Sequence, residues 1–172
     1  LPLRTPAGVG PSWDARAFDE RTLLIAGGKD GLHVLDVSAP LAPVLLATLP
    51  LPGLSRALVV DGTRAYVSAL AGGGHIVDLS TKTAPRLVRT LGHGEPVWAM
   101  LPLGDRTLVA EGRYLLAVNE TGGVIDAVAS TGYVMDLAKR LDDTIYTFEF
   151  GGISRKKIQR DDGRSRPVLA VP

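Results

Sequence analysis

Apolar residues recur along this chain in short runs that are β-branched or alternating, with glycine, proline and aspartate between them. Runs of this kind predict strands and turns, and none has the length or the 3.6-residue period of a helix. One stretch shows the pattern well, with strands expected at 56–60, 65–70, 75–79 and 86–91, separated by Asp61-Gly62, by Gly72-Gly73-Gly74 and by a loop at 80–85. The sequence therefore predicts an all-β protein.

The same pattern repeats along the chain. The segment 31–38, Gly-Leu-His-Val-Leu-Asp-Val-Ser, returns as Gly-Gly-His-Ile-Val-Asp-Leu-Ser at 73–80, so Asp36 and Asp78 are 42 residues apart. Weaker copies follow at 115–121 and 157–161. Hairpin turns with Asp or Gly, such as Asp142-Asp143 in the last copy, and proline-led strands recur in phase with these segments. Repeated units of roughly 40 residues with four short strands are typical of β-propeller blades.

We therefore expect a β-propeller with four four-stranded blades, at about 13–55, 56–96, 97–134 and 135–172, in a single domain or part-propeller spanning 1–172. Four blades can form a complete ring or part of a larger seven- or eight-blade ring. Because four is the tight extreme, we expect the ring to be completed by other polypeptide or by self-association.

The segment 31–38, followed by Ala39-Pro40 and a proline-led strand at Pro43, resembles the LVIVD-type repeat of bacterial and archaeal propeller proteins. The resemblance is strongest over 15–96, extends to about 134 and is positional beyond. It implies the propeller fold and a location outside the cell, at its surface or in the periplasm, because such proteins are commonly exported. It implies no activity, since the family has no shared catalytic motif.

Composition narrows the function classes. The chain has 172 residues, 45% of them hydrophobic, which suffices for one buried core without disulfides or structural metal ions. A net charge of +1 gives no overall attraction for nucleic acid or an anionic membrane, and the apolar runs are too short to span one. The absence of cysteine excludes disulfides, thiolate metal sites and cysteine nucleophiles.

The repeated polar residues favour structural roles over chemistry. Asp36 and Asp78 end a strand before a Ser, where a carboxylate usually accepts backbone N–H groups of the turn. His33 and His75 occupy equivalent positions one blade apart, too far for one metal ion, and His93 lies in a glycine-rich loop. We predict no catalytic residue, no metal site and no cofactor.

Residues just ahead of each inner strand are the candidates for a binding surface, because in propellers these positions ring the mouth of the central channel. Counting six residues back from each hairpin turn gives Trp13, Ser55, Trp98 and Asp136. With their neighbours, the predicted rim is Trp13, Asp14, Arg56, Trp98, Tyr133 and Asp136. Aromatic faces beside charges are favoured at binding hot spots, whereas tryptophans wedged between blades would belong to the core.

The function predicted from these features is a non-catalytic interaction or scaffold module that presents a rigid surface to a protein partner. The alternative is a propeller enzyme of hydrolase or lyase type with a site at the channel mouth. The basic residues Arg155, Lys156, Lys157, Arg160, Arg164 and Arg166 predict a solvated edge or a contact surface of the last blade.

Overall fold

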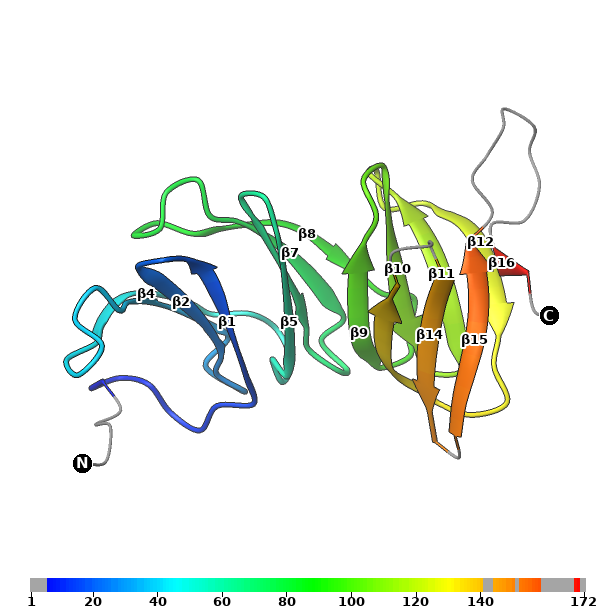
Figure 1. Cartoon of the computed structure of the whole chain (residues 1–172), viewed down its shortest axis with the longest axis horizontal. Coiled ribbons are helices and arrows are strands. Elements are labelled where there is room, and N and C mark those ends of the chain that lie inside the picture. Colours follow the sequence, from blue (N-terminus) through cyan, green and yellow to red (C-terminus); the bar gives the residue numbers. More distant parts are fainter. Residues whose placement is uncertain (1–5, 141–143, 151, 159–168, 171–172) are drawn as a thin grey trace. The chain divides into compact units, whose positions relative to one another are not determined.

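The computed structural model describes residues 6–140, 144–150, 152–158 and 169–170. Within these residues the chain is all-β and forms four antiparallel sheets of four strands each. The chain divides into two compact units, one ending at Val97 and one beginning at Trp98, and each unit contains two sheets (Figure 1). Each sheet is built from strands that follow one another in sequence, as in propeller blades.

In the first unit, the first sheet consists of β1 (Asp14–Asp19), β2 (Thr22–Ala26), β3 (Leu32–Asp36) and β4 (Val44–Leu49). The second consists of β5 (Ala57–Asp61), β6 (Arg64–Ser68), β7 (Gly74–Asp78) and β8 (Arg86–Leu91). The strands expected at 56–60, 65–70, 75–79 and 86–91 are therefore confirmed, with ends that differ by two residues or fewer.

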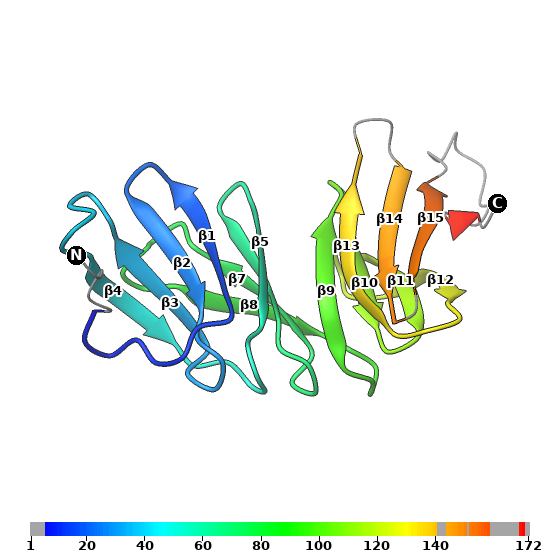
Figure 2. The ribbon, with the colours of Figure 1, turned by 60° about the horizontal axis from the view of Figure 1, so that its bottom comes forward.

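The third sheet consists of β9 (Val97–Pro102), β10 (Arg106–Glu111), β11 (Tyr114–Asn119) and β12 (Val124–Ala129), and it belongs to the second unit except for Val97, the last residue of the first. The fourth consists of β13 (Val134–Lys139), β14 (Thr144–Glu149), β15 (Gly152–Ile158) and β16 (Leu169–Ala170) (Figure 2). The four sheets are called blades 1 to 4 below. The predicted turn at Asp142-Asp143 and the basic residues Arg160, Arg164 and Arg166 lie outside the described residues.

Each unit has a core between its two blades. In the first unit, residues of β2 and β3 pack on residues of β5, β6 and β7, and the fully buried members of this cluster include Leu24, Ala26, Leu32, Ala65 and Val67. In the second unit Leu108, Leu115 and Ala117 of blade 3 pack with Ile145 of blade 4. Apolar residues that alternate along the strands thus turn one face of a blade toward its neighbour.

The connection between the second and third strands differs among the blades. Blades 1 and 2 have five-residue loops at 27–31 and 69–73, whereas the connections in blades 3 and 4 are shorter, with Glu111 pairing to Tyr114 and Glu149 to Gly152. This difference corrects the expected position of the third strand in blade 4. Spacing placed the fourth copy of the repeated segment at 157–161, whereas β15 already starts at Gly152.

Backbone hydrogen bonds connect these loops to the start of the next blade. The N–H and C=O of Gly28 bond to Ser55 at 3.0 and 2.9 Å, and those of Leu70 bond to Val97 at 3.1 and 3.0 Å. Gly28 and Leu70 are 42 residues apart and both have a positive φ, +61° and +50°. Leu70 is the one described residue other than glycine in this conformation, which costs a side-chain-bearing residue about 1–2 kcal/mol.

Replacing Leu70 with glycine is therefore expected to change the free energy of unfolding by less than about 0.5 kcal/mol. Relief of the left-handed backbone offsets both the lost side chain and the added freedom of the unfolded chain. Leu46→Gly is the matched control, because Leu46 is also partly buried but has no positive φ. We expect that change to cost roughly 2 kcal/mol or more in urea unfolding. Equal losses for both variants would contradict the prediction.

Candidate functional site

Backbone pairing defines which residues begin the inner strands. The N–H of Trp13 donates to the carbonyl of Ala26, and the N–H of Arg56 donates to that of Ser68, so Trp13 and Arg56 are equivalent. Trp98 is their counterpart in blade 3, because it follows Val97 as Arg56 follows Ser55. Counting from the turns was right for the two tryptophans. It was one residue off at Ser55, because β1 carries a bulge between Ala17 and Asp19 and β5 pairs without one.

In blade 4 the count was also one residue off, but in the opposite direction. The N–H of Val134 bonds to the carbonyl of Gly112 at 3.0 Å, as Val97 bonds to Leu70. Met135 is thus the counterpart of the tryptophans, and Asp136, paired with Phe148, is the counterpart of Asp14, paired with Ala26.

Trp13 and Arg56 form the centre of a small surface cluster in the first unit. The guanidinium carbon of Arg56 lies 5.6 Å from the centroid of the Trp13 ring, within the range of a cation–π interaction. The indole is held close to the backbone, since a Cβ added at Gly28 would lie 3.2 Å from its Nε1. Trp13 is nevertheless 55% exposed. Its ring is therefore ordered by contacts with blades 1 and 2 but open to solvent.

The side chain of Asp14 forms a hydrogen bond between blade 1 and blade 2. Its Oδ2 accepts the backbone N–H of Leu58 on β5 at 3.0 Å, and its Oδ1 accepts the N–H of Ala15 at 2.8 Å and forms an ion pair with Arg16 at 3.0 Å. Both oxygens are engaged with the protein. Asp14, next to Trp13 in the chain, thus links blade 1 to blade 2, and its ion-pair partner Arg16 is a residue that the sequence did not single out.

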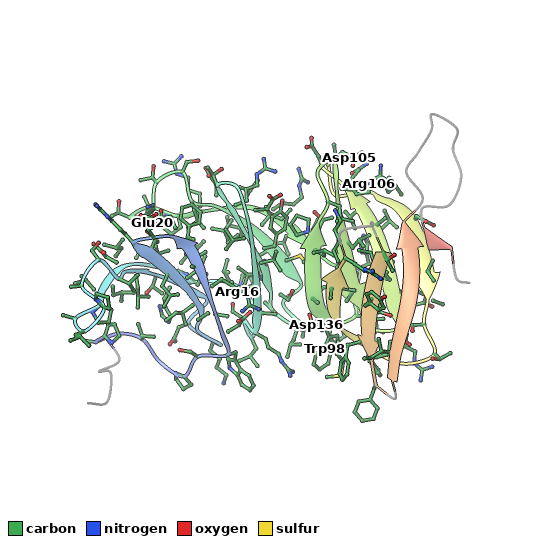
Figure 3. The ribbon with its side chains drawn as sticks, in the orientation of Figure 1. Arg16, Glu20, Trp98, Asp105, Arg106 and Asp136 are labelled. Carbon is green, nitrogen blue, oxygen red and sulfur yellow. The ribbon has the colours of Figure 1, made fainter. Side chains whose placement is uncertain are left out.

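The other three predicted rim residues lie in the second unit. Trp98 on β9 is partly buried, and Asp136 on β13 is exposed with its Oδ1 accepting the N–H of Leu137 at 2.8 Å (Figure 3). Tyr133 is 44% exposed, and the guanidinium carbon of Arg113 lies 6.0 Å from its ring centroid. A second cationic group therefore stands over a second exposed ring. Arg113 gave no signal in the sequence because its turn position is outside the repeated segments.

The repeated aspartates hold their turns, as predicted. Asp36 Oδ1 accepts the N–H and the hydroxyl of Ser38 at 2.8 and 2.6 Å, and Asp78 does the same with Ser80 at 2.9 and 2.6 Å. These hydrogen bonds lower the pKa of both carboxyl groups below the ordinary value. The bond from the serine hydroxyl has the largest effect, followed by the bond from the backbone N–H. Asn119 is the uncharged counterpart in blade 3, with its Oδ1 accepting from Thr121.

His33 and His75 are fully buried within their own blades. Nδ1 of His33 lies 2.9 Å from Thr48 Oγ1, and Nδ1 of His75 lies 3.0 Å from Thr90 Oγ1. Burial lowers the pKa of both imidazoles. Among the residues that the structure describes, no group of three His, Asp or Glu side chains could hold a metal ion, and no helix is long and apolar enough to cross a membrane. The predicted lack of a catalytic site stays a prediction.

Solved structures similar to this chain include two β-propeller domains. The WD40 β-propeller domain of Doa1 is 16% identical, with a TM-score of 0.67 over 84% of this chain and 49% of that chain. The β-propeller domain of Cps50 (Swd1) from Myceliophteria thermophila is 10% identical, with a TM-score of 0.67 over 88% of this chain and 55% of that one. This chain thus spans about half the length of these two structures.

A third similar structure is close to this chain in length. The computationally designed Ika4 protein is 15% identical, with a TM-score of 0.68 over 90% of this chain and 98% of that chain. At these identities the similarity establishes the fold alone. No curated protein matches the sequence significantly.

The family comparison agrees with the repeats seen in the sequence and the structure. The model of the LVIVD repeat matches residues 23–49, which include β2 to β4, and residues 52–91, which include β5 to β8. The matched segments contain the His–Thr pairs and the Asp–Ser turns of blades 1 and 2. The chain therefore contains LVIVD repeats in blades 1 and 2 and has a β-propeller fold.

Proposed function

We propose that this chain is a non-catalytic interaction module, and that the cluster of Trp13, Asp14, Arg16 and Arg56 is part of its contact surface for a protein partner. The single observation that carries the proposal is that Trp13 is 55% exposed while Arg56 and the backbone at Gly28 hold its ring in place. A large aromatic face that is ordered before binding loses little conformational entropy when a partner covers it. Trp and Arg are also the residues most enriched at binding hot spots.

The arrangement of charge supports a protein partner. Arg56 covers part of the indole, while Asp14 and Arg16 form an ion pair beside it, so the cluster has an apolar centre and a polar border of both signs. Protein interfaces commonly have this composition, with an aromatic anchor and a solvated rim.

Replacing Trp13 with alanine is expected to weaken capture of the partner by about 30-fold or more, the effect of a hot-spot residue. The same change should lower the free energy of unfolding by only about 1 kcal/mol, because the ring is exposed. The measurement is a quantitative pull-down from cell extract with immobilised wild-type and variant chains, followed by a binding isotherm for each protein whose capture differs.

Tyr114→Ala is the matched control, since Tyr114 is 49% exposed but lies on β11 outside the cluster. We expect this variant to capture the same proteins as the wild type. A loss of roughly 3–5 kcal/mol in stability for Trp13→Ala would instead identify the tryptophan as core. Identical capture by all three chains would refute the proposed contact surface.

A further inference from the structure

Blade 4 exposes a row of residues that runs across three of its strands. Asp136 pairs with Phe148, and Phe148 pairs with Ile153, so the three side chains lie on the same face of the sheet. Phe148 is 52% exposed and Ile153 is 71% exposed. Two large apolar side chains next to each other on a sheet face are unusual on a solvated surface.

The equivalent row of blade 1 is covered by the next blade. It consists of Asp14, Ala26 and Leu32, which pair across β1, β2 and β3 in the same way. Ala26 and Leu32 are completely buried against a cluster from blade 2 that comprises Leu58, Ala65, Val67 and Val77. Asp14 bonds to the backbone of Leu58 in that blade. In blade 1, this row is thus the face on which a neighbouring blade docks.

Blade 3 repeats the arrangement in the second unit. Ala110 and Leu115 are the equivalents of Phe148 and Ile153, they pair with each other, and both are completely buried. They are covered by blade 4, through the residues Val134, Leu137 and Ile145. The same face is therefore a blade-docking face in both junctions that lie within one unit.

The opposite face of blade 1, which corresponds to the face that blade 2 packs against blade 1, is incompletely covered. Ala15, Leu23 and Ile25 occupy the positions at which blade 2 presents Leu58, Ala65 and Val67 to its neighbour. Ala15 is exposed and Leu23 and Ile25 are half-buried, whereas Ala65 and Val67 are fully buried. The sizes also match, because Ala15 stands where blades 2 and 4 have Leu58 and Leu137, and Phe148 stands where blades 1 and 3 have Ala26 and Ala110.

We propose that the row of Asp136, Phe148 and Ile153 docks the face of blade 1 that carries Ala15, Leu23 and Ile25 in a second copy of this chain. The contact continues the blade-to-blade junctions already formed within each unit. The bulky Phe148 fills the space that the small Ala15 leaves. A second copy is favoured as the source of blade 1 because this chain spans 49% and 55% of two similar propeller domains, so two copies supply the length of one such domain.

This interaction does not involve Trp13, so it can be tested apart from the proposed contact surface. The first test is the mass of the chain in solution, measured by light scattering during size exclusion across a dilution series. We expect a mass of twice 18.1 kDa for the wild type and 18.1 kDa for Phe148→Asp and for Ile153→Ser. Val124→Asp is the control on β12, where Val124 is 43% exposed, and it should keep the doubled mass.

The outcomes of this test separate clearly. A wild-type chain that stays at 18.1 kDa throughout, or a Phe148→Asp variant and an Ile153→Ser variant that both keep the doubled mass, would overturn the proposal. Because both side chains are exposed, folding of the variants should be unaffected, and circular dichroism checks this. Loss of the doubled mass in Val124→Asp as well would also count against this particular face.

A disulfide experiment distinguishes a second copy from the chain's own first blade. The sequence has no cysteine, so Leu23→Cys with Ile153→Cys creates one possible pair. Leu115→Cys with Ile145→Cys is the matched reference, because these residues are the equivalents within one buried cluster. With oxidised glutathione as oxidant, the reference should close a bond within one chain, and the test pair should link two chains. A bond within one chain, or no bond, for the test pair would overturn the proposal.

Discussion

Replacing Gly31 with alanine is expected to lower the free energy of unfolding by roughly 3 kcal/mol, as the sum of two effects. Gly31 has a φ of +92°, which is strained for any residue with a Cβ. A Cβ at this position would also lie 2.2 Å from the carbonyl oxygen of Leu49 and 2.6 Å from the amide of Leu51, both backbone atoms. The loop at 27–31 would have to move away from β4, and it contains Gly28, which bonds to the next blade.

Gly62→Ala is the control for the backbone effect alone. Gly62 also has a positive φ, +57°, but a Cβ there would meet nothing within 4 Å. We expect that variant to lose only about 1 kcal/mol. Gly73, 42 residues after Gly31, should behave as Gly31 does, because its Cβ would lie 2.5 Å from the carbonyl oxygen of Leu91. Urea unfolding of the three variants measures these differences, and equal losses at Gly31 and Gly62 would show that close approach is unimportant.

Replacing His75 with leucine is expected to cost about 2–3 kcal/mol, although leucine is similar in size. His75 Nε2 donates to the carbonyl of Pro52 at 2.9 Å and Nδ1 accepts from Thr90 at 3.0 Å, so the change leaves two polar groups without their partner. Blade 3 shows the apolar solution, since Leu116 pairs with Ala127 where His75 pairs with Thr90. Adding Thr90→Ala to His75→Leu should therefore recover about 1 kcal/mol. A double variant less stable than His75→Leu would contradict this pairing.

The stability difference between the wild type and His75→Leu is predicted to depend on pH. Burial lowers the pKa of His75, and the bond to Pro52 opposes this effect only in part. The unfolded chain therefore binds a proton near the ordinary pKa of 6.5 while the folded chain does not. Stability is fully present above that pH and falls as the pH decreases below it. This decrease should be smaller in His75→Leu, with the remainder due to His33, as measured by urea unfolding at pH 7.5, 6.5 and 5.5.

Much of the fold could be predicted because it depends on neighbours in sequence. The strands of blade 2 and the Asp–Ser turns follow from alternation, turn residues and side-chain bonds that span two residues, as at Asp36 and Ser38. The candidate site was predictable only in part. Trp13 was named from its position before an inner strand and Arg56 as a neighbour of Ser55, but their direct contact requires the pairing of two blades.

The sequence by itself determined the repeat length, the all-β class, the four-stranded unit and the LVIVD-type repeats of blades 1 and 2, since each depends on periodic local patterns. Tertiary structure decided which residues are equivalent at the blade starts, because the bulge in β1 is absent from β5 and shifts the count by one residue. It also decided that Asp14 bonds to the next blade and that Phe148 and Ile153 are exposed, whereas Ala26 and Leu32 are buried. Apolar residues on a blade look the same in sequence whether or not another blade covers them, because burial depends on contacts between distant segments.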